Sequence, residues 1–198
     1  MNILVAGATG QTGLRLIQAL KTKGHSPIAL VRDSSDTGQL PSEVQIRRGD
    51  LTDLRDGICE GCEAVIFAAG SGSSTGPEMT DKVDRDGARR LVDLAVRAGV
   101  RRFVMLSSVG ADNPDRDSKL GHYLQAKHDA DEHLISSGLE FAILRPVALT
   151  DDEGTRNMRF GDEVDVTGKA ARGDVAAVLA DAVDNPEWTG KVLTMQSI

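Results

Sequence analysis

The amino-acid sequence predicts an α/β fold, a doubly wound parallel sheet with helices on both faces. Short apolar runs typical of buried strands alternate with longer segments of helical periodicity. Gly24, Gly99 and Gly138 each follow a helical segment, as is typical of helix C-termini. A glycine-rich turn, residues 7–13, joins the first strand to the first helix. Because parallel strands need crossover connections, this alternation indicates right-handed strand–helix–strand units.

The individual elements follow from the same patterns. Strands are expected at Asn2–Ala6, Ile28–Val31, Val44–Arg47, Ala64–Ala68, Arg102–Leu106, Phe141–Leu144 and Val192–Met195. Helices are expected at Gly13–Lys23, Thr80–Ala98, Tyr123–Ser137 and Asp174–Asp184. The glycine- and serine-rich residues 71–76 predict a flexible loop where the ligand crevice of such a sheet lies. Residues 151–169 are polar, and we expect an irregular, partly mobile flap there.

Length and composition exclude several classes of protein. A chain of 198 residues with 40% hydrophobic and 27% charged residues suits a single globular domain, 1–198. The net charge of −7 argues against sequence-independent nucleic-acid binding. Since no apolar run approaches the roughly 20 residues of a membrane helix, we expect no membrane association. The first expected strand leaves no room for a removable leader, so the expected location is cytoplasmic.

The turn at residues 7–13 has the pattern G-x-x-G-x-x-G between strand and helix. Glycines let a phosphate approach the backbone, and the helix N-terminus offers unpaired N–H groups and a positive dipole end. The turn therefore predicts a dinucleotide held by its pyrophosphate. The alternative is an ordinary turn, because glycines also punctuate loops.

Two segments that follow strands predict how the rest of the dinucleotide is bound. Arg32 follows the second strand, where an arginine accommodates a ribose 2′-phosphate and an acidic residue binds a 2′-hydroxyl. Arg32 therefore favours NADP over NAD, unless the neighbouring Asp33 turns inward and repels phosphate. Both can also be solvated charges in a turn. Asp50 follows the third strand and is expected beside adenine, or as the cap of a following helix.

Tyr123 and Lys127 are four residues apart in an expected helix, so both lie on one face. An ammonium beside a phenol stabilises the phenolate, which suits a general acid or base. Ser107 and Ser108 end the strand 102–106, so we expect their hydroxyls to face the crevice and one of them to polarise a substrate carbonyl. The alternative is a helix-surface pair without chemistry.

Cys59 and Cys62 form a C-x-x-C pair, which can be a redox centre or half of a zinc site. No histidine pair supplies the other half, so no metal site is expected. A redox dithiol normally begins a helix after a strand, whereas this pair lies just before the expected strand Ala64–Ala68. We therefore expect a loop that happens to carry two thiols.

The chain resembles the short-chain dehydrogenase/reductase superfamily over nearly its whole length. It is most similar to the atypical NAD(P)H-binding branch, which also resembles epimerase/dehydratase and NmrA-like proteins. The motifs that carry the resemblance are residues 7–13, 49–53, 68–70, 102–108, 123–127 and 144–146. The resemblance implies a Rossmann-type NAD(P)-binding fold, in which Lys127 also holds the nicotinamide ribose and Ser108 is the catalytic serine. Asp84 stands where many extended relatives carry asparagine.

The resemblance also completes the list of expected site residues. The expected cofactor-binding residues are Gly7, Thr9, Gly10, Gln11, Thr12, Gly13, Arg32, Asp50, Leu51, Ala68, Ala69, Gly70, Ser107, Lys127, Pro146 and Val147. The expected catalytic residues are Ser108, Tyr123 and Lys127. Only the short segment 146–198 remains for the substrate side, which implies a small carbonyl substrate in place of a nucleotide sugar.

The expected function is that of an oxidoreductase that uses NADP, or NAD, to reduce or oxidise a small carbonyl compound. Two alternatives follow from the same residues. One is a non-catalytic NAD(P)H-binding sensor, as NmrA-like proteins are; the other is an NADPH-dependent flavin or quinone reductase, which needs no tyrosine. The chain is expected to be a monomer or a homodimer.

Overall fold

The computed structural model describes residues 1–72 and 75–198 and contains a sheet of eight strands. The strand order is β3-β2-β1-β4-β5-β6-β10-β8, and every neighbouring pair is parallel except β10 and β8. Its strands are β1 (Asn2–Ala6), β2 (Ser26–Val31), β3 (Gln45–Arg48), β4 (Ala64–Phe67), β5 (Arg102–Leu106), β6 (Glu140–Pro146), β8 (Met158–Phe160) and β10 (Lys191–Ser197). The predicted doubly wound sheet is confirmed. The strand order reverses between β1 and β4, which opens a crevice at the carboxyl ends of these strands.

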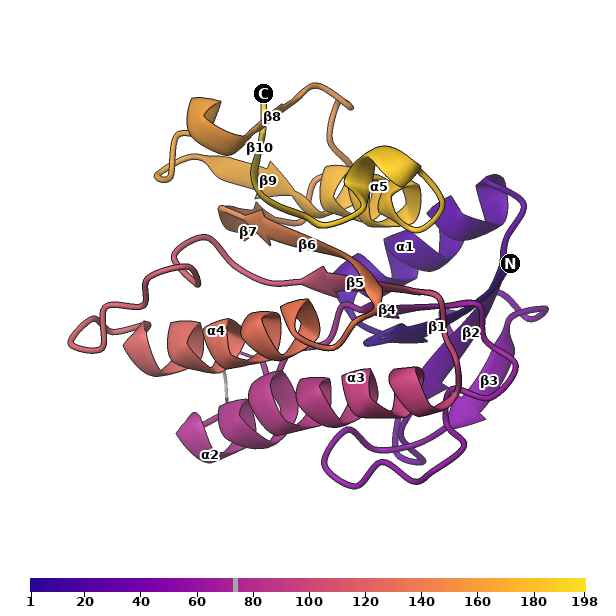
Figure 1. Ribbon diagram of the computed structural model, residues 1–198. Helices are drawn as coiled ribbons and strands as arrows, with labels where there is room; N and C mark the ends of the chain where they lie inside the picture. Colours follow the sequence, from indigo (N-terminus) through magenta and orange to yellow (C-terminus); the bar gives the residue numbers. More distant parts are fainter. Residues whose placement is uncertain (73–74) are drawn as a thin grey trace.

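Helices cover both faces of this sheet (Figure 1). On one face, α1 (Gln11–Thr22) packs against α5 (Arg172–Ala182). On the other lie α3 (Ala88–Arg97) and α4 (Gly121–Ile135). The two faces of β1 explain why its sequence is continuously apolar: Ile3 and Val5 belong to the core on the α1–α5 side, and Leu4 and Ala6 to the other core.

The third helical segment differs from the prediction. One uninterrupted helix was expected over residues 80–98, but the structure has a short α2 (Pro77–Thr80), a π-helical segment η1 (Asp81–Gly87) and then α3. Each π turn contains an extra residue, which changes the side chains that face inward. Gly87 permits this packing, because a Cβ there would lie 2.7 Å from the Leu51 carbonyl oxygen.

The expectation of an irregular segment over residues 151–169 is wrong in part. Besides β8, the region from Pro146 to Ala171 contains β7 (Ala148–Thr150), a 3-10 turn η2 (Gly161–Glu163) and β9 (Lys169–Ala171); a further 3-10 turn, η3, spans Pro186–Trp188. The strand β8 pairs antiparallel with β10, with Phe160 opposite Met195. Partners distant in the sequence thus order a polar segment.

Two expectations concern what surrounds this core. In the expected loop 71–76, residues 73–74 lie outside the described residues, so flexibility of the whole loop stays a prediction. None of the helices in the described part of the chain has the length and apolar character that a membrane crossing requires.

Candidate functional site

A cavity of about 580 Å³ opens at the carboxyl ends of β1, β2, β3 and β4. Nine of the predicted cofactor-binding residues line it: Gly7, Thr9, Gly10, Arg32, Asp50, Leu51, Ala68, Ala69 and Gly70. These residues come from four separate segments of the chain, which the sheet topology brings together. Most of this wall is backbone or small side chain, so a ligand can approach the main chain closely.

The glycine turn has the geometry of an anion cradle. Gly7 has a φ of +83°, and a Cβ there would lie 2.7 Å from the Ala68 carbonyl oxygen. A Cβ on Gly13 would collide with the Gly7 carbonyl oxygen, so α1 begins directly against β1. Gly10 caps α1 without a side-chain hydrogen bond, and the first turn contains no acidic residue. The free amides and positive dipole end of α1 therefore fit a diphosphate.

The end of β2 carries positive charge toward the same cavity. Arg32 and Ser35 both line it, and the Arg32 amide donates a hydrogen bond of 3.1 Å to the Ser35 Oγ. Arg48, at the end of β3, donates to the Arg32 carbonyl oxygen at 2.8 Å. Asp33 does not turn inward: its side chain is 96% exposed and faces Arg48, with 4.0 Å between Oδ1 and Nε. The carboxylate that would repel a phosphate thus points to solvent.

Asp50 lines the cavity beside Arg32, but it does not cap a helix, because residues 51–60 contain none. Its Oδ1 accepts hydrogen bonds from the Thr52 amide at 2.9 Å and the Thr52 hydroxyl at 2.8 Å. The Thr52 amide is the main cause that lowers the pKa of Asp50; burial opposes it. A stable carboxylate at this position can accept a hydrogen bond from an adenine amino group.

Lys127 and Tyr123 lie together on α4. The Lys127 Nζ is 5.7 Å from the centre of the half-buried Tyr123 ring and 5.6 Å from the centre of the Phe67 ring, distances at which a cation interacts with an aromatic face. Lys127 is almost completely buried, and its Nζ lies 3.0 Å from Asp84 Oδ1. Burial disfavours its ammonium, but the electrostatic interactions with Tyr123 and Asp84 and the hydrogen bond to Asp84 outweigh burial and raise the pKa of Lys127. These contacts favour the ammonium form of Lys127.

Comparison with known proteins assigns the chain to a family. Residues 7–186 match the family model described as NAD(P)H-binding. The chain belongs to this NAD(P)H-binding family. It is 35% identical over 192 residues to the uncharacterized sugar epimerase YhfK of Bacillus subtilis (strain 168). The aligned region covers 93% of this chain and 88% of that relative.

Solved structures extend the family likeness to the fold. A Bacillus halodurans protein, provisionally described as an NAD-dependent epimerase/dehydratase, has a TM-score of 0.94 and 35% sequence identity to this chain. The superposition covers 100% of this chain and 94% of the Bacillus halodurans chain. The oxidoreductase ylbE from Lactococcus lactis has a TM-score of 0.87 at 30% identity, with 100% and 91% coverage. The Rossmann-type NAD(P)-binding fold expected from the sequence motifs is confirmed, as is the likeness to epimerase/dehydratase proteins.

Within this NAD(P)H-binding protein, the two serines after β5 have different surroundings. Ser107 is buried, and its hydroxyl donates to Asp131 Oδ2 at 2.8 Å, so the expectation that it faces the crevice is wrong. Arg145 donates to the same oxygen at 3.0 Å. Burial raises the pKa of Asp131, although Arg145 and Ser107 oppose this shift. Ser108 is only partly buried, and its hydroxyl donates to the neighbouring Val109 carbonyl oxygen at 3.3 Å, which leaves its oxygen able to accept.

The remaining predicted residues do not line the cavity. Thr12 and Gly13 are buried in the first turn of α1, while Gln11 faces a separate hollow between α1 and α5. Pro146 ends β6, and Val147 packs in the core on the α1–α5 side. Ser107, Ser108, Tyr123 and Lys127 also lie outside the cavity wall. The cavity therefore corresponds to the adenosine and diphosphate part of the predicted site.

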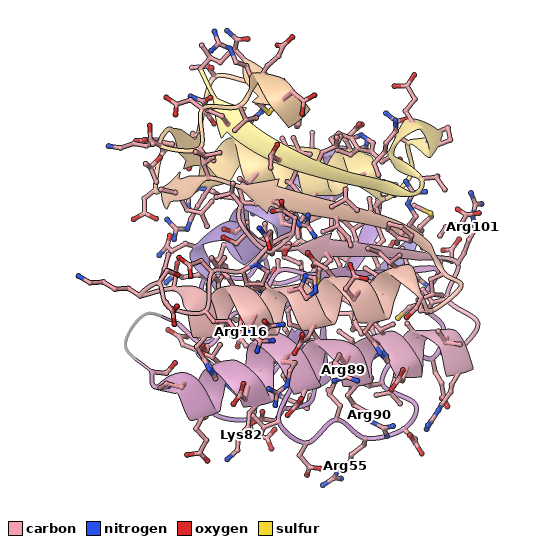
Figure 2. All side chains as sticks on the ribbon, turned by 60° about the vertical axis from the view of Figure 1, so that its left-hand side comes forward. Arg55, Lys82, Arg89, Arg90, Arg101 and Arg116 are labelled. Atoms are coloured by element: carbon pink, nitrogen blue, oxygen red, sulfur yellow. The ribbon has the colours of Figure 1, made fainter. Side chains whose placement is uncertain are left out.

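Sequence reasoning missed one wall of the cavity. Met79, Lys82 and Val83 line it from α2 and η1, together with Ser35 and Thr75. Figure 2 shows Lys82 on the outer side of this helix, where its Nζ bonds Glu78 Oε1 at 2.7 Å, so it lies at the rim. The sequence contains a pattern that could have predicted this wall: residues 79, 82 and 83 have the spacing of one helix face directly after a glycine-rich loop.

The two cysteines do not line this cavity. They lie in a turn, as expected from the sequence. Both are buried and free. Burial raises the pKa of the Cys59 thiol to about 12 and also raises the pKa of Cys62, although the neighbouring Arg47 opposes the shift at Cys62. A raised pKa disfavours the thiolate, which is the reactive form of cysteine. Cys59 and Cys62 are therefore expected to contribute to packing and not to redox chemistry.

Proposed function

We propose that this protein is an NADPH-dependent reductase that delivers hydride to a small carbonyl compound. The observation that carries the proposal is that one cavity brings together the free amides at the start of α1 and the side chain of Arg32. The amides suit a diphosphate, and Arg32 suits a 2′-phosphate. The outward orientation of Asp33 supports NADP over NAD, and Arg48 supplies a second positive charge nearby. The bound coenzyme supplies the hydride; the protein supplies orientation and charge.

In this proposal Tyr123 gives the proton to the carbonyl oxygen as hydride arrives at the carbonyl carbon. The ammonium of Lys127 beside the ring stabilises the negative charge that then develops on the phenol oxygen. The partly buried Ser108 hydroxyl can turn from the Val109 carbonyl to donate to the substrate oxygen. Reduction then needs one hydride and one proton, and Tyr123 regains its proton from solvent.

The cofactor part is tested by replacing Arg32 with alanine and titrating NADPH and NADH by calorimetry. The variant loses about 10-fold or more in NADPH affinity, since hydrogen bonds to charged groups contribute about 1.5–3 kcal/mol, and changes NADH affinity little. Arg55, an exposed arginine without an ion-pair partner among the described residues, is the matched control. Equal losses for both coenzymes would reject the phosphate contact.

The catalytic part is tested with Tyr123→Phe and a panel of small aldehydes and ketones. The variant loses about 100-fold or more in kcat with NADPH affinity unchanged, because general acid catalysis contributes about 10²–10⁴-fold. Turnover retained by Tyr123→Phe would favour direct reduction of flavins or quinones. No turnover by the unmodified protein on the carbonyl and quinone panels would favour a coenzyme-binding sensor.

A further inference from the structure

A buried carboxylate lies between the cavity and Lys127. Asp84 is 0% exposed and projects from the π-helical segment η1. Its Oδ2 accepts a hydrogen bond of 3.0 Å from the Ser71 amide. Its Oδ1 lies 3.0 Å from Lys127 Nζ and has no other partner among the residues that the structure describes. One carboxylate therefore contacts both a segment of the cavity wall and the buried ammonium.

The contact with the wall is close. A Cβ on Gly70 would lie 3.3 Å from Asp84 Oδ1, so this segment packs directly on the carboxylate. Gly70 and Ser71 both line the cavity, and so does Val83, the residue before Asp84. Any displacement of the Asp84 carboxylate therefore moves the surface on which the coenzyme is proposed to lie. π-Helical turns are rare and are frequently found at functional sites.

The contact with Lys127 depends on charge. The Lys127 side chain is 3% exposed, and the other hydrogen bond of its ammonium goes to the Leu106 carbonyl oxygen at 3.3 Å. A second buried acid, Asp131 on α4, accepts hydrogen bonds from Ser107 and Arg145 through its Oδ2. An ammonium buried without a counterion is strongly disfavoured, so removing the Asp84 charge would drive Lys127 from this position.

We propose that Asp84 is a positioning residue for hydride transfer, which holds the 70–71 wall and the Lys127 ammonium in one fixed arrangement beside Tyr123. The proposal rests on the proposed function, since it assumes a coenzyme in the cavity. Asp84 acts through Lys127 and the cavity wall and does not itself touch the reacting atoms. An asparagine at position 84 keeps an oxygen that can accept from the Ser71 amide, so Asp84→Asn leaves the cavity wall and the adenosine half in place and removes only the charge that holds Lys127 beside the nicotinamide half.

The test compares Asp84→Asn, which keeps the size of the side chain and removes its charge, with Asp81→Asn. Asp81 lies on the same π-helical segment but pairs with Arg85 and His122, at 2.8 and 3.1 Å. We expect Asp84→Asn to lower kcat about 100-fold, the loss typical of a misplacement of about 1 Å. Affinity for 2′,5′-ADP, which contains only the adenosine half and its 2′-phosphate, should change less than about twofold. Asp81→Asn should leave both quantities unchanged.

A double variant keeps the proposal testable if Asp84→Asn folds poorly. Asp84→Asn with Lys127→Leu removes both buried charges, and its kcat should equal that of Lys127→Leu alone, because the two groups act as one unit. A further loss in the double variant would overturn the proposal, as would normal kcat in Asp84→Asn. If the unmodified protein binds NADPH but turns over nothing, the proposed function fails; if it turns over and Asp84→Asn does too, only this inference fails.

Discussion

Substitution of Gly7 by alanine tests the link between the glycine turn and the cavity. Gly7 and Gly24 form a matched pair, because their φ values are +83° and +79°. An L-residue in this region costs about 1–2 kcal/mol. A Cβ on Gly24 would meet nothing within 4 Å, so the conformational cost is its whole effect. Gly24→Ala should therefore lower the free energy of unfolding by about 1–2 kcal/mol.

At Gly7 a second cost is added. Its Cβ would lie 2.7 Å from the carbonyl oxygen of Ala68 and from backbone atoms of Ala69. These atoms belong to the chain that leaves β4, so they can yield only if the backbone moves, at about 1–3 kcal/mol. The expected total for Gly7→Ala is about 2–5 kcal/mol, from the two costs together.

Urea unfolding measures the stability of both variants, and calorimetry measures their affinity for NADPH. Ala68 and Ala69 also line the cavity, so Gly7→Ala should weaken NADPH binding at least about 10-fold in whatever fraction remains folded, about 1.4 kcal/mol. Gly24→Ala should bind normally. Equal destabilisation by the two substitutions, or normal NADPH binding by Gly7→Ala, would refute this reasoning.

Two further predictions concern regions outside the cavity. Burial opposes ionisation of Asp174, but the Ser197 hydroxyl and the Arg156 amide and guanidinium outweigh it and lower the pKa of Asp174. Its contribution to stability is thus present above about pH 4 and is lost as the pH falls through its lowered pKa; Asp174→Asn should flatten this acid dependence in pH-dependent urea unfolding, and an unchanged slope would contradict it. Cys59 and Cys62 should resist a thiol reagent at pH 8 in the folded protein and react in denaturant, so rapid labelling of the native state would contradict their burial.

The sequence was sufficient to predict those strands whose apolar pattern matches their burial in the folded protein. The strands at residues 2–6 and 102–106 have the predicted bounds, because each is a short apolar run buried on both faces. The glycine turn and the residues after β2, β3 and β4 were predicted to converge, and nine of them line one cavity. This follows from topology, since parallel strands bring their carboxyl ends to one edge.

Features that depend on distant partners could not be predicted. The strand β8 is three residues long and lies within a polar segment, and it forms by pairing with β10. The hydroxyl of Ser107 was expected in the crevice, but Asp131, 24 residues away, binds it inside the core. The Asp84–Lys127 pair joins residues 43 positions apart through a π-helical register that no periodicity in the sequence indicates.

A crystal structure of the protein with NADPH would test the central claim most directly. We expect the diphosphate on the amides of residues 7–13, the 2′-phosphate beside Arg32, and the nicotinamide ribose within hydrogen-bonding distance of Lys127. A coenzyme bound elsewhere on the surface would contradict the account, as would an empty cavity in crystals grown with millimolar NADPH.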